Sequence, residues 1–238
     1  RANDSGYYSD DVKVDISIND NDKDKGLGES QFSGIKKVDY KVVCEYDGGK
    51  REITQTGNLY TYDAVFPEQT KFESGTVVLD KNTNLPESFS DSIIVDSAKN
   101  NSDNVYVQIT VEDNAGNVME PEESYEPDDK CQVKLRINSG KPTAKVTFAD
   151  EPNRVDNGYG WFRAERTAVI EITDRNTTFD SEAAMEGIQI TGTNYEGKKV
   201  ELDAEAIKGW TSEGDKHTAS VVFANDARYE WSISYINK

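Results

Sequence analysis

The chain has few of the residues that build catalytic and metal centres. Its 238 residues include one histidine, His217, two cysteines and two methionines. A lone histidine cannot supply the paired imidazoles of common zinc sites, and no nucleophile elbow, phosphate loop or dinucleotide fingerprint occurs. Nothing in the sequence brings two carboxylates together, as glycoside hydrolysis requires. We therefore expect a protein that is not an enzyme, and we name no catalytic residue.

Long apolar runs are also missing, and positive charge is scarce. No segment approaches the roughly 20 apolar residues of a membrane span. The 27 Lys and Arg face 45 Asp and Glu, which gives a net charge of -18. Such a field repels phosphate backbones and anionic lipid, so nucleic acid and membrane insertion are poor expectations. No signal peptide is visible and the first residue is not Met, which we interpret as a piece of a longer, surface-displayed precursor.

Strict alternation of apolar and polar residues dominates what is present. The alternating rows lie at 12–18, 38–46, 105–111, 131–137, 168–172, 219–223 and 229–235. A period of two over this many segments predicts antiparallel strands with one buried face. Helical signal is confined to 181–187 and 202–209, with Ser181 or Asp203 near a cap position. The expected fold class is all-β.

The chain also resembles itself. YYSDDVKVDISIND (7–20) matches WFRAERTAVIEITD (161–174), since an aromatic pair leads and an alternating strand ends in Asp. VYVQITVEDN (105–114) matches YEWSISYINK (229–238) in the same order. Two ordered matches predict two copies of one unit, and the first copy is longer by about 30 residues. We expect the extra length between residues 47 and 100, where turn residues are dense.

The boundary between the copies is expected at INSGKPT (137–143), where a strand ends and Ser-Gly-Lys-Pro turns. The predicted domains are 1–138, with the insertion at about 47–100, and 139–238. The second copy stops at the turn after which the first copy continues into CQVKLRI. We therefore expect the second domain to lack its last strand.

Four motifs resemble a known family: SGIKKVDYKV (33–42), TQTGNLYTY (54–62), NNSDNVYVQITVEDNAGN (100–117) and NGYGWFRAERTAVIEITDRN (157–176). They are similar to the bacterial immunoglobulin-like tandem repeats of Gram-positive, gut Firmicutes cell-surface proteins. The resemblance implies two tandem immunoglobulin-like β-sandwiches in a secreted, cell-wall-anchored parent, next to neighbouring repeats. The acidic segment EPEESYEPDD (120–129) departs from the family pattern and is expected to be an added loop.

The segment DNDKDKG (20–26) places three aspartates, Asp20, Asp22 and Asp24, at alternate positions. An EF-hand loop needs Gly at its sixth position and Glu at its twelfth, but here Gly26 is seventh and the twelfth residue is Gln31. The EF-hand interpretation is therefore excluded. A looser Ca2+ site on these aspartates remains one interpretation, and a solvated acidic turn is the other. No other cofactor is expected.

The two cysteines, Cys44 and Cys131, each lie in the apolar row of a strand. Both side chains are therefore expected to point into the first sandwich. A disulfide across that core is one interpretation in an extracellular setting, and two buried thiols is the other.

Five aromatic residues are the candidate binding residues: Tyr7, Tyr8, Trp161, Phe162 and Trp210. Exposed Tyr and Trp are good binding anchors. The pairs Tyr7–Tyr8 and Trp161–Phe162 recur in both copies, which favours a structural role in closing one end of each sandwich. Trp210 follows Gly209 in an expected loop, in one copy only, which favours binding.

Three functions follow as hypotheses. The leading one is a non-enzymatic bacterial cell-surface module that engages a host protein, with an immunoglobulin variable domain as the candidate that the family resemblance implies. The second is a passive stalk or spacer in a surface adhesin. The third is a carbohydrate-binding module that uses exposed Trp and Tyr faces.

Overall fold

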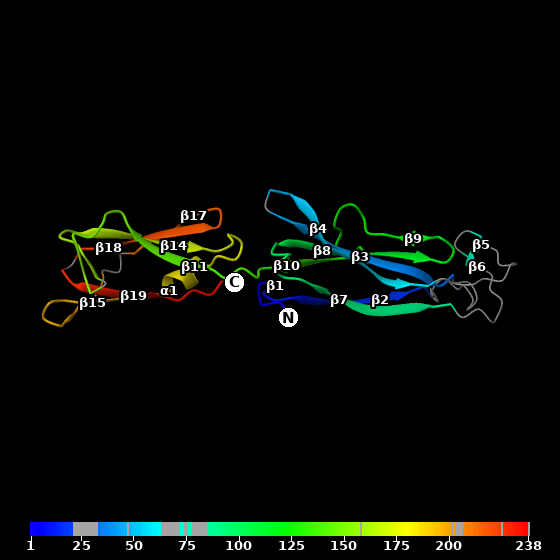
Figure 1. Ribbon diagram of the computed structural model, residues 1–238, viewed down its shortest axis with the longest axis horizontal. Helices are drawn as coiled ribbons and strands as arrows, with labels where there is room; N and C mark the ends of the chain where they lie inside the picture. The colour runs from blue at the N-terminus through cyan, green and yellow to red at the C-terminus, as the bar shows by residue number, and fades with distance from the viewer. Residues whose placement is uncertain are drawn as a thin grey trace. The chain divides into compact units, whose positions relative to one another are not determined.

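The computed structural model describes residues 1–20, 33–46, 48–62, 72–73, 76–77, 85–157, 159–200, 202, 207–224 and 226–237 (Figure 1). The structure is 54% strand and 3% helix, which confirms the all-β prediction. The chain forms two compact units, Arg1–Ser139 and Gly140–Lys238, and the break falls inside the INSGKPT segment. Each unit is described by itself.

The larger sheet of the first unit has the strand order β1-β10-β8-β3-β4. The short strand β9 also pairs with β8, at Val111 and Glu112, further along β8 than the residues that pair with β10. Its strands are β1 (Tyr7–Tyr8), β3 (Ile35–Glu45), β4 (Arg51–Thr61), β8 (Asn104–Asp113), β9 (Val118–Met119) and β10 (Gln132–Ile137). β1 runs parallel to β10, whereas the other neighbours are antiparallel. Alternation of side chains along the strands turns one face of this sheet toward the core, and in the central strand β8 Tyr106 and Gln108, which alternate with core residues, are buried as well.

A second sheet covers that face. It pairs β2 (Val12–Asn19) with β7 (Ser88–Val95), and Figure 1 shows the two strands side by side below the larger sheet. Ten buried residues from both sheets form the core: Val12, Ile16, Val42, Cys44, Ile93, Val95, Val105, Val107, Leu135 and Ile137. The first unit is therefore a two-layer sandwich.

The segment 47–100, where we expect the extra length, contributes regular structure to this sandwich. It contains β4 at the edge of the larger sheet and β7, which carries Ile93 and Val95 of the core. It also contains the short pair β5 (Phe72–Glu73) and β6 (Thr76–Val77).

The second unit is also layered. One sheet has the order β11-β14-β18-β17 and another has the order β16-β15-β19. The strands of these sheets are β11 (Thr143–Phe148), β14 (Arg166–Thr173), β15 (Ile188–Thr193), β16 (Lys199–Val200), β17 (Ile207–Glu213), β18 (Lys216–Phe223) and β19 (Arg228–Ile233). A separate hairpin joins β12 (Arg154–Asp156) to β13 (Tyr159–Trp161).

The core of the second unit is smaller and richer in aromatic residues. Ile170, Ile188 and Val221 are buried in it, and half-buried side chains such as Trp210 and Trp231 pack around them. A second aromatic group links Phe148 to Phe162, Phe223 and Trp231, with ring centroids 5.1 to 6.4 Å apart. Aromatic rings therefore supply much of the buried apolar surface of this unit.

The helix prediction is confirmed in one place and corrected in another. Helix α1 (Ser181–Glu186) forms, but its N-cap is Asp180, whose carboxylate accepts hydrogen bonds from the Glu182 and Ala183 amides. Half of the other expected helix, residues 203–206 of 202–209, lies outside the described residues, and its last residues, 207–209, belong to strand β17. Instead of forming a helix, these last residues pair with strand β18. The pairing gives them backbone hydrogen bonds to a neighbouring strand and a core to pack against.

Substitution of Ile137 by Ala should lower the free energy of unfolding of the first unit by about 3 kcal/mol, because the side chain is fully buried and leaves a cavity. The matched control is Ile53→Ala, which removes the same atoms from a side chain that is 63% exposed and should cost less than about 0.5 kcal/mol. Urea titration measures both variants, and equal losses would contradict this description of the core.

Candidate functional site

The first predicted aromatic pair is part of the first unit's interior. Tyr7 is only 4% exposed, and the Arg136 guanidinium lies over its ring, 4.0 Å from the centroid. The Tyr7 hydroxyl also accepts a hydrogen bond from Arg136, and Tyr8 packs half-buried against the core. These two residues therefore do not form an exposed binding surface, and the structural interpretation of this pair fits better than the binding one.

Trp210 differs from its prediction in the same way. It lies in β17 and is half-buried against the core, and its ring meets Phe179 edge-on with centroids 5.4 Å apart. The β17–β18 pairing shifts register between Lys208 and Thr211, so Trp210 stands at an irregularity of the strand rather than in a loop. A glycine before a tryptophan is typical of a loop, which is why the sequence favours one here. In the structure the same glycine lies at a β-bulge, and the sequence does not distinguish the two.

The second aromatic pair divides. Phe162 turns inward against Phe148, with centroids 5.1 Å apart, and the Arg166 guanidinium lies 5.4 Å from its ring centroid. Trp161, the last residue of β13, is 52% exposed. Of the five predicted binding residues, Trp161 is therefore the one that presents a large exposed ring to solvent.

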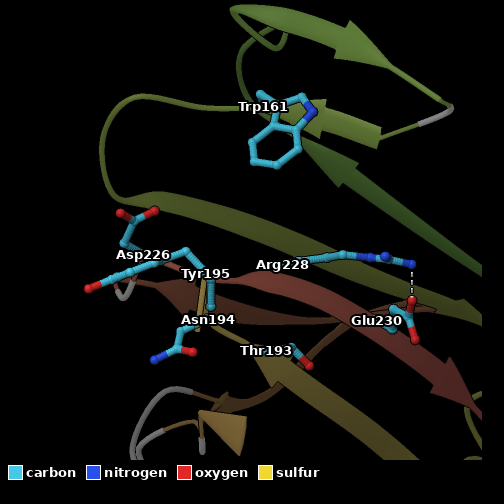
Figure 2. Close-up of a pocket in the computed structure, with 8 residues that line it drawn as sticks. Trp161, Thr193, Asn194, Tyr195, Asp226, Arg228 and Glu230 are labelled. Carbon is cyan, nitrogen blue, oxygen red and sulfur yellow. Dashed lines mark hydrogen bonds and ion pairs between the residues drawn. The ribbon is translucent and has the colours of Figure 1, made fainter. Parts of the chain in front are cut away.

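Trp161 lines a pocket of about 380 Å³ in the second unit (Figure 2). We call it the Trp161 pocket, and its lining residues are Trp161, Thr193, Asn194, Tyr195, Asp226, Ala227, Arg228 and Glu230. Figure 2 shows Trp161 on one side and residues of the β15 end and of β19 on the other. The volume is within the range of small-molecule sites, and the lining mixes aromatic rings with carboxylate, amide and guanidinium groups.

Backbone turns set the two sides of this pocket. Asn153 joins the start of the β12–β13 hairpin to its end: its amide donates to the Trp161 carbonyl and its side chain accepts from the Arg163 amide. On the other side, the Asn194 side chain accepts from the Glu196 and Lys198 amides in a turn where Gly197 has φ of +78°. This turn leaves Tyr195 at its tip, 90% exposed.

The charged residues of the pocket follow one another on β19 and just before it. Arg228 and Glu230 form an ion pair, which Figure 2 shows as a dashed line. Asp226 is exposed, and within the described part of the chain neither a hydrogen bond nor an ion pair engages its carboxylate. The pocket therefore carries one negative charge that its own cation does not balance.

Sequence reasoning did not name Tyr195, Asp226 or Arg228. The signal for Tyr195 was available, because the N-Y-E-G run (194–197) is a turn motif that places its second residue at the tip. Asp226 and Arg228 had no comparable signal, since their position depends on the antiparallel pairing of β19 with β15.

A second polar group lies around the only histidine, whose side chain is fully buried. The Nε2 atom of His217 lies 3.0 Å from the Asp174 carbonyl oxygen, and its Nδ1 atom lies 2.7 Å from the Ser212 hydroxyl. A carbonyl can only accept, so Nε2 carries the hydrogen and Nδ1 accepts from Ser212. Phe179 stacks on the imidazole with centroids 3.7 Å apart. These contacts join strand β18 to the turn after β14. Because the ring is fully buried, the satisfied hydrogen bonds contribute to stability rather than to a site open to solvent.

The Asp174 carboxylate extends this network to the C-terminal segment. It accepts hydrogen bonds from the Tyr235 hydroxyl at 2.9 Å and from the Asn237 side chain at 3.0 Å. Burial raises the pKa of the Tyr235 phenol, and the neighbouring Asp174 charge adds to this effect.

The raised pKa of Tyr235 predicts a pH dependence. In the unfolded chain a tyrosine loses its proton near pH 10, whereas the folded protein retains the proton to higher pH. The stabilisation by Tyr235 is therefore complete below about pH 10 and is lost as the pH rises further. The difference in unfolding free energy between the natural chain and Tyr235→Phe should shrink as the pH rises from about 10 to about 12. A difference that stays constant over this range, measured by urea titration, would contradict the assignment.

The predicted calcium ligands are only partly described. Asp20 is half-buried, and its carboxylate accepts the Gly34 amide at 2.7 Å, while Asp22 and Asp24 lie outside the described residues. Burial raises the pKa of Asp20, opposed by the Gly34 hydrogen bond, and the Asp113 charge raises it further. Among the described residues no group of three or more His, Cys, Asp or Glu is arranged to hold a metal ion.

Of the two interpretations of the cysteines, the structure shows the buried thiols, since Cys44 and Cys131 are both buried and are not bridged. Cys44 of β3 lies opposite Val105 of β8, whereas the Cys131 carbonyl accepts from the amide of Ile109, four residues further along β8. Four residues of strand span about 13 Å, and bridged cysteines need Cα atoms within about 7 Å. Alternation indicated that both side chains are buried, but the register keeps the two sulfur atoms apart.

The cysteines give a direct chemical test. Iodoacetamide should label two thiols per chain in denaturant without reductant and almost none in the native protein, because both cysteines are buried and burial raises the Cys131 pKa. Mass spectrometry counts the labels. If the denatured chain accepts no label until reductant is added, the two cysteines form a disulfide, and the strand register that keeps them apart is wrong.

Comparison with known proteins adds no assignment, since no family model and no curated protein matches the chain. Among the described residues, no helix has the length and apolar character needed to cross a membrane.

Proposed function

We propose that the chain is a non-enzymatic binding module of a bacterial cell-surface protein, built from two immunoglobulin-like domains, and that it engages a host protein through the Trp161 pocket. The observation that carries this proposal is the set of exposed side chains around the pocket. Trp161 is 52% exposed and Tyr195 is 90% exposed, and Arg228 lines the same pocket. Trp, Tyr and Arg are the residue types enriched in the energetically dominant part of protein interfaces.

The strand order supports the immunoglobulin-like interpretation. In that fold the strands C, F and G form one sheet, and A, B, E and D form the other. The order β10-β8-β3 of the first unit corresponds to G-F-C, and the β2–β7 pair corresponds to B-E. In the second unit, β11-β14-β18-β17 corresponds to A-B-E-D, and β19-β15 corresponds to F-C. The segments matched in the internal repeat thus take the same place in both orders.

The position of the pocket supports binding over a purely passive role. Binding residues are frequent on loops that a rigid scaffold holds in place, and the pocket is formed by two turns at strand ends. The corresponding aromatic of the first unit, Tyr7, is buried, so the exposed ring belongs to the second unit alone. A uniform spacer would have no reason to differ between its repeats in this way.

A carbohydrate is the second candidate ligand, and one observation favours it. The pocket combines an exposed indole with the polar side chains of Asn194, Asp226 and Glu230, a combination that can stack on a sugar ring and bond its hydroxyls. We place it second because Tyr195, 90% exposed at the tip of its turn, offers contact area that a protein partner can cover more fully than a single sugar ring. An immunoglobulin variable domain remains the named candidate partner, implied by the family resemblance.

Replacement of Trp161 by Ala should weaken the complex with the host partner by about 30-fold or more, because loss of an interface anchor costs at least about 2 kcal/mol. The partner is first captured from human mucosal secretion on the immobilised chain and identified by mass spectrometry. Its Kd is then measured by surface plasmon resonance, with purified polyclonal Fab tested in parallel.

The matched control is Val155→Ala, which shortens another side chain of the same hairpin that is 66% exposed and does not line the pocket. This variant should bind within about threefold of the natural chain. Failure to capture any partner would favour the spacer hypothesis, whereas unchanged binding of a captured partner by Trp161→Ala would show that the Trp161 pocket is not its contact site. Retention on neutral glycans that Trp161→Ala abolishes would replace the protein partner by a carbohydrate.

A further inference from the structure

We propose that the Trp161 pocket receives a cationic side chain, lysine or arginine, from the surface of the partner protein. This inference rests on the proposed function and specifies the chemistry of its ligand. It is carried by the charge of the pocket lining, by the exposed ring of Trp161 and by an internal comparison between the two units.

The lining of the pocket has an unbalanced negative charge. Asp226 and Glu230 supply two carboxylates and Arg228 supplies one guanidinium. Because Arg228 pairs with Glu230, the Asp226 carboxylate is left to interact with a ligand. Residues 139–238 as a whole hold 12 Lys and Arg against 17 Asp and Glu, so the surrounding field has the same sign. Both features attract cations and repel phosphate, sulfate and sialic acid groups.

The Trp161 ring offers the other half of a cation site. A tryptophan face attracts an ammonium or guanidinium group through its quadrupole, and Trp is the best of the aromatic residues for this contact. In Figure 2 the Arg228 side chain extends toward Glu230 and away from Trp161. The cation–π contacts of the described residues include Arg166 over Phe162 and Arg136 over Tyr7, but no cation lies over Trp161.

The first unit already contains the contact that we infer for the second. Tyr7 and Trp161 occupy the same position in the internal repeat. Arg136 lies 4.0 Å from the Tyr7 ring centroid and donates a hydrogen bond to its hydroxyl, so there a cation from the chain itself covers the ring. In the second unit the corresponding ring is exposed and lines a pocket that also contains the unengaged Asp226 carboxylate. A cation from a partner can therefore take the place that Arg136 takes in the first unit.

The direct test uses small probes and nuclear magnetic resonance. The indole N–H signal of Trp161, one of three tryptophans, is assigned with Trp161→Phe. The probes are Nα-acetyl-lysine methylamide, Nα-acetyl-arginine methylamide and Nα-acetyl-norleucine methylamide, the last of which has the lysine stem without its ammonium group. Lysine and arginine should shift the Trp161 signal with saturation, and norleucine should bind at least about tenfold more weakly. Equal binding of lysine and norleucine, no shift with any probe, or a shift with methyl glycosides alone would overturn the inference.

The charge of Asp226 is tested with a matched pair of variants. Asp226→Asn should weaken lysine binding by about fivefold or more, because it removes the carboxylate and keeps its shape. Glu186→Gln removes one negative charge from an exposed residue of the same unit that does not line the pocket, and it should leave lysine binding unchanged. Equal losses of lysine affinity in the two variants would mean that only the overall negative charge of the unit attracts lysine, and would overturn the specific contact with Asp226.

Binding to the partner protein separates this inference from the proposed function. If both are correct, Trp161→Ala and Asp226→Asn each weaken the complex, and Asp226→Asn reduces its dependence on salt. If Trp161→Ala weakens the complex but Asp226→Asn leaves both affinity and salt dependence unchanged, the pocket binds the partner and the cationic ligand is wrong. If Trp161→Ala has no effect on a partner that is captured, the proposed function is wrong and this inference falls with it.

Discussion

Burial of one face of each strand is the constraint on which the rest of this structure depends. With 45 acidic residues and few large apolar clusters, the chain has enough hydrophobic side chains for thin layers only. Two sheets that face one another use them fully, because every second residue enters a shared core. In the first unit this core has ten buried residues, and two strands, β2 and β7, suffice to cover it. Turns and strand ends are left free for other uses.

The two units treat the same sequence position differently. In the first unit, β1 pairs with β10, and Arg136 of β10 covers the Tyr7 ring. In the second unit the matching aromatic ends a hairpin, and its neighbour Phe162 turns inward to the aromatic group around Phe148. The inward residue packs against this aromatic group, whereas Trp161 keeps 52% of its surface exposed. A large aromatic side chain that stays exposed is a candidate for recognition.

Much of the fold could be predicted from the alternation of residues, because a period of two is a local property of the sequence. The all-β class and the strands at 12–19, 104–113 and 166–173 follow from it. The candidate site could not be predicted in the same way. Whether Tyr7 is covered depends on Arg136, which is 129 residues away, and whether Cys44 meets Cys131 depends on register. Trp210 was misjudged because a bulge in β17 is not visible in its sequence. These features are set by pairing between distant strands, which a single sequence does not report.

The central claim is that the turns around Trp161, and not the rest of the surface, contact the partner. Hydrogen exchange of the complex, compared with that of the chain alone, tests this most directly. The account predicts slower exchange in residues 159–163, 193–198 and 226–230 when the partner is bound, with the first unit unchanged. Protection confined to the first unit, for example at the acidic loop 120–129, would contradict it.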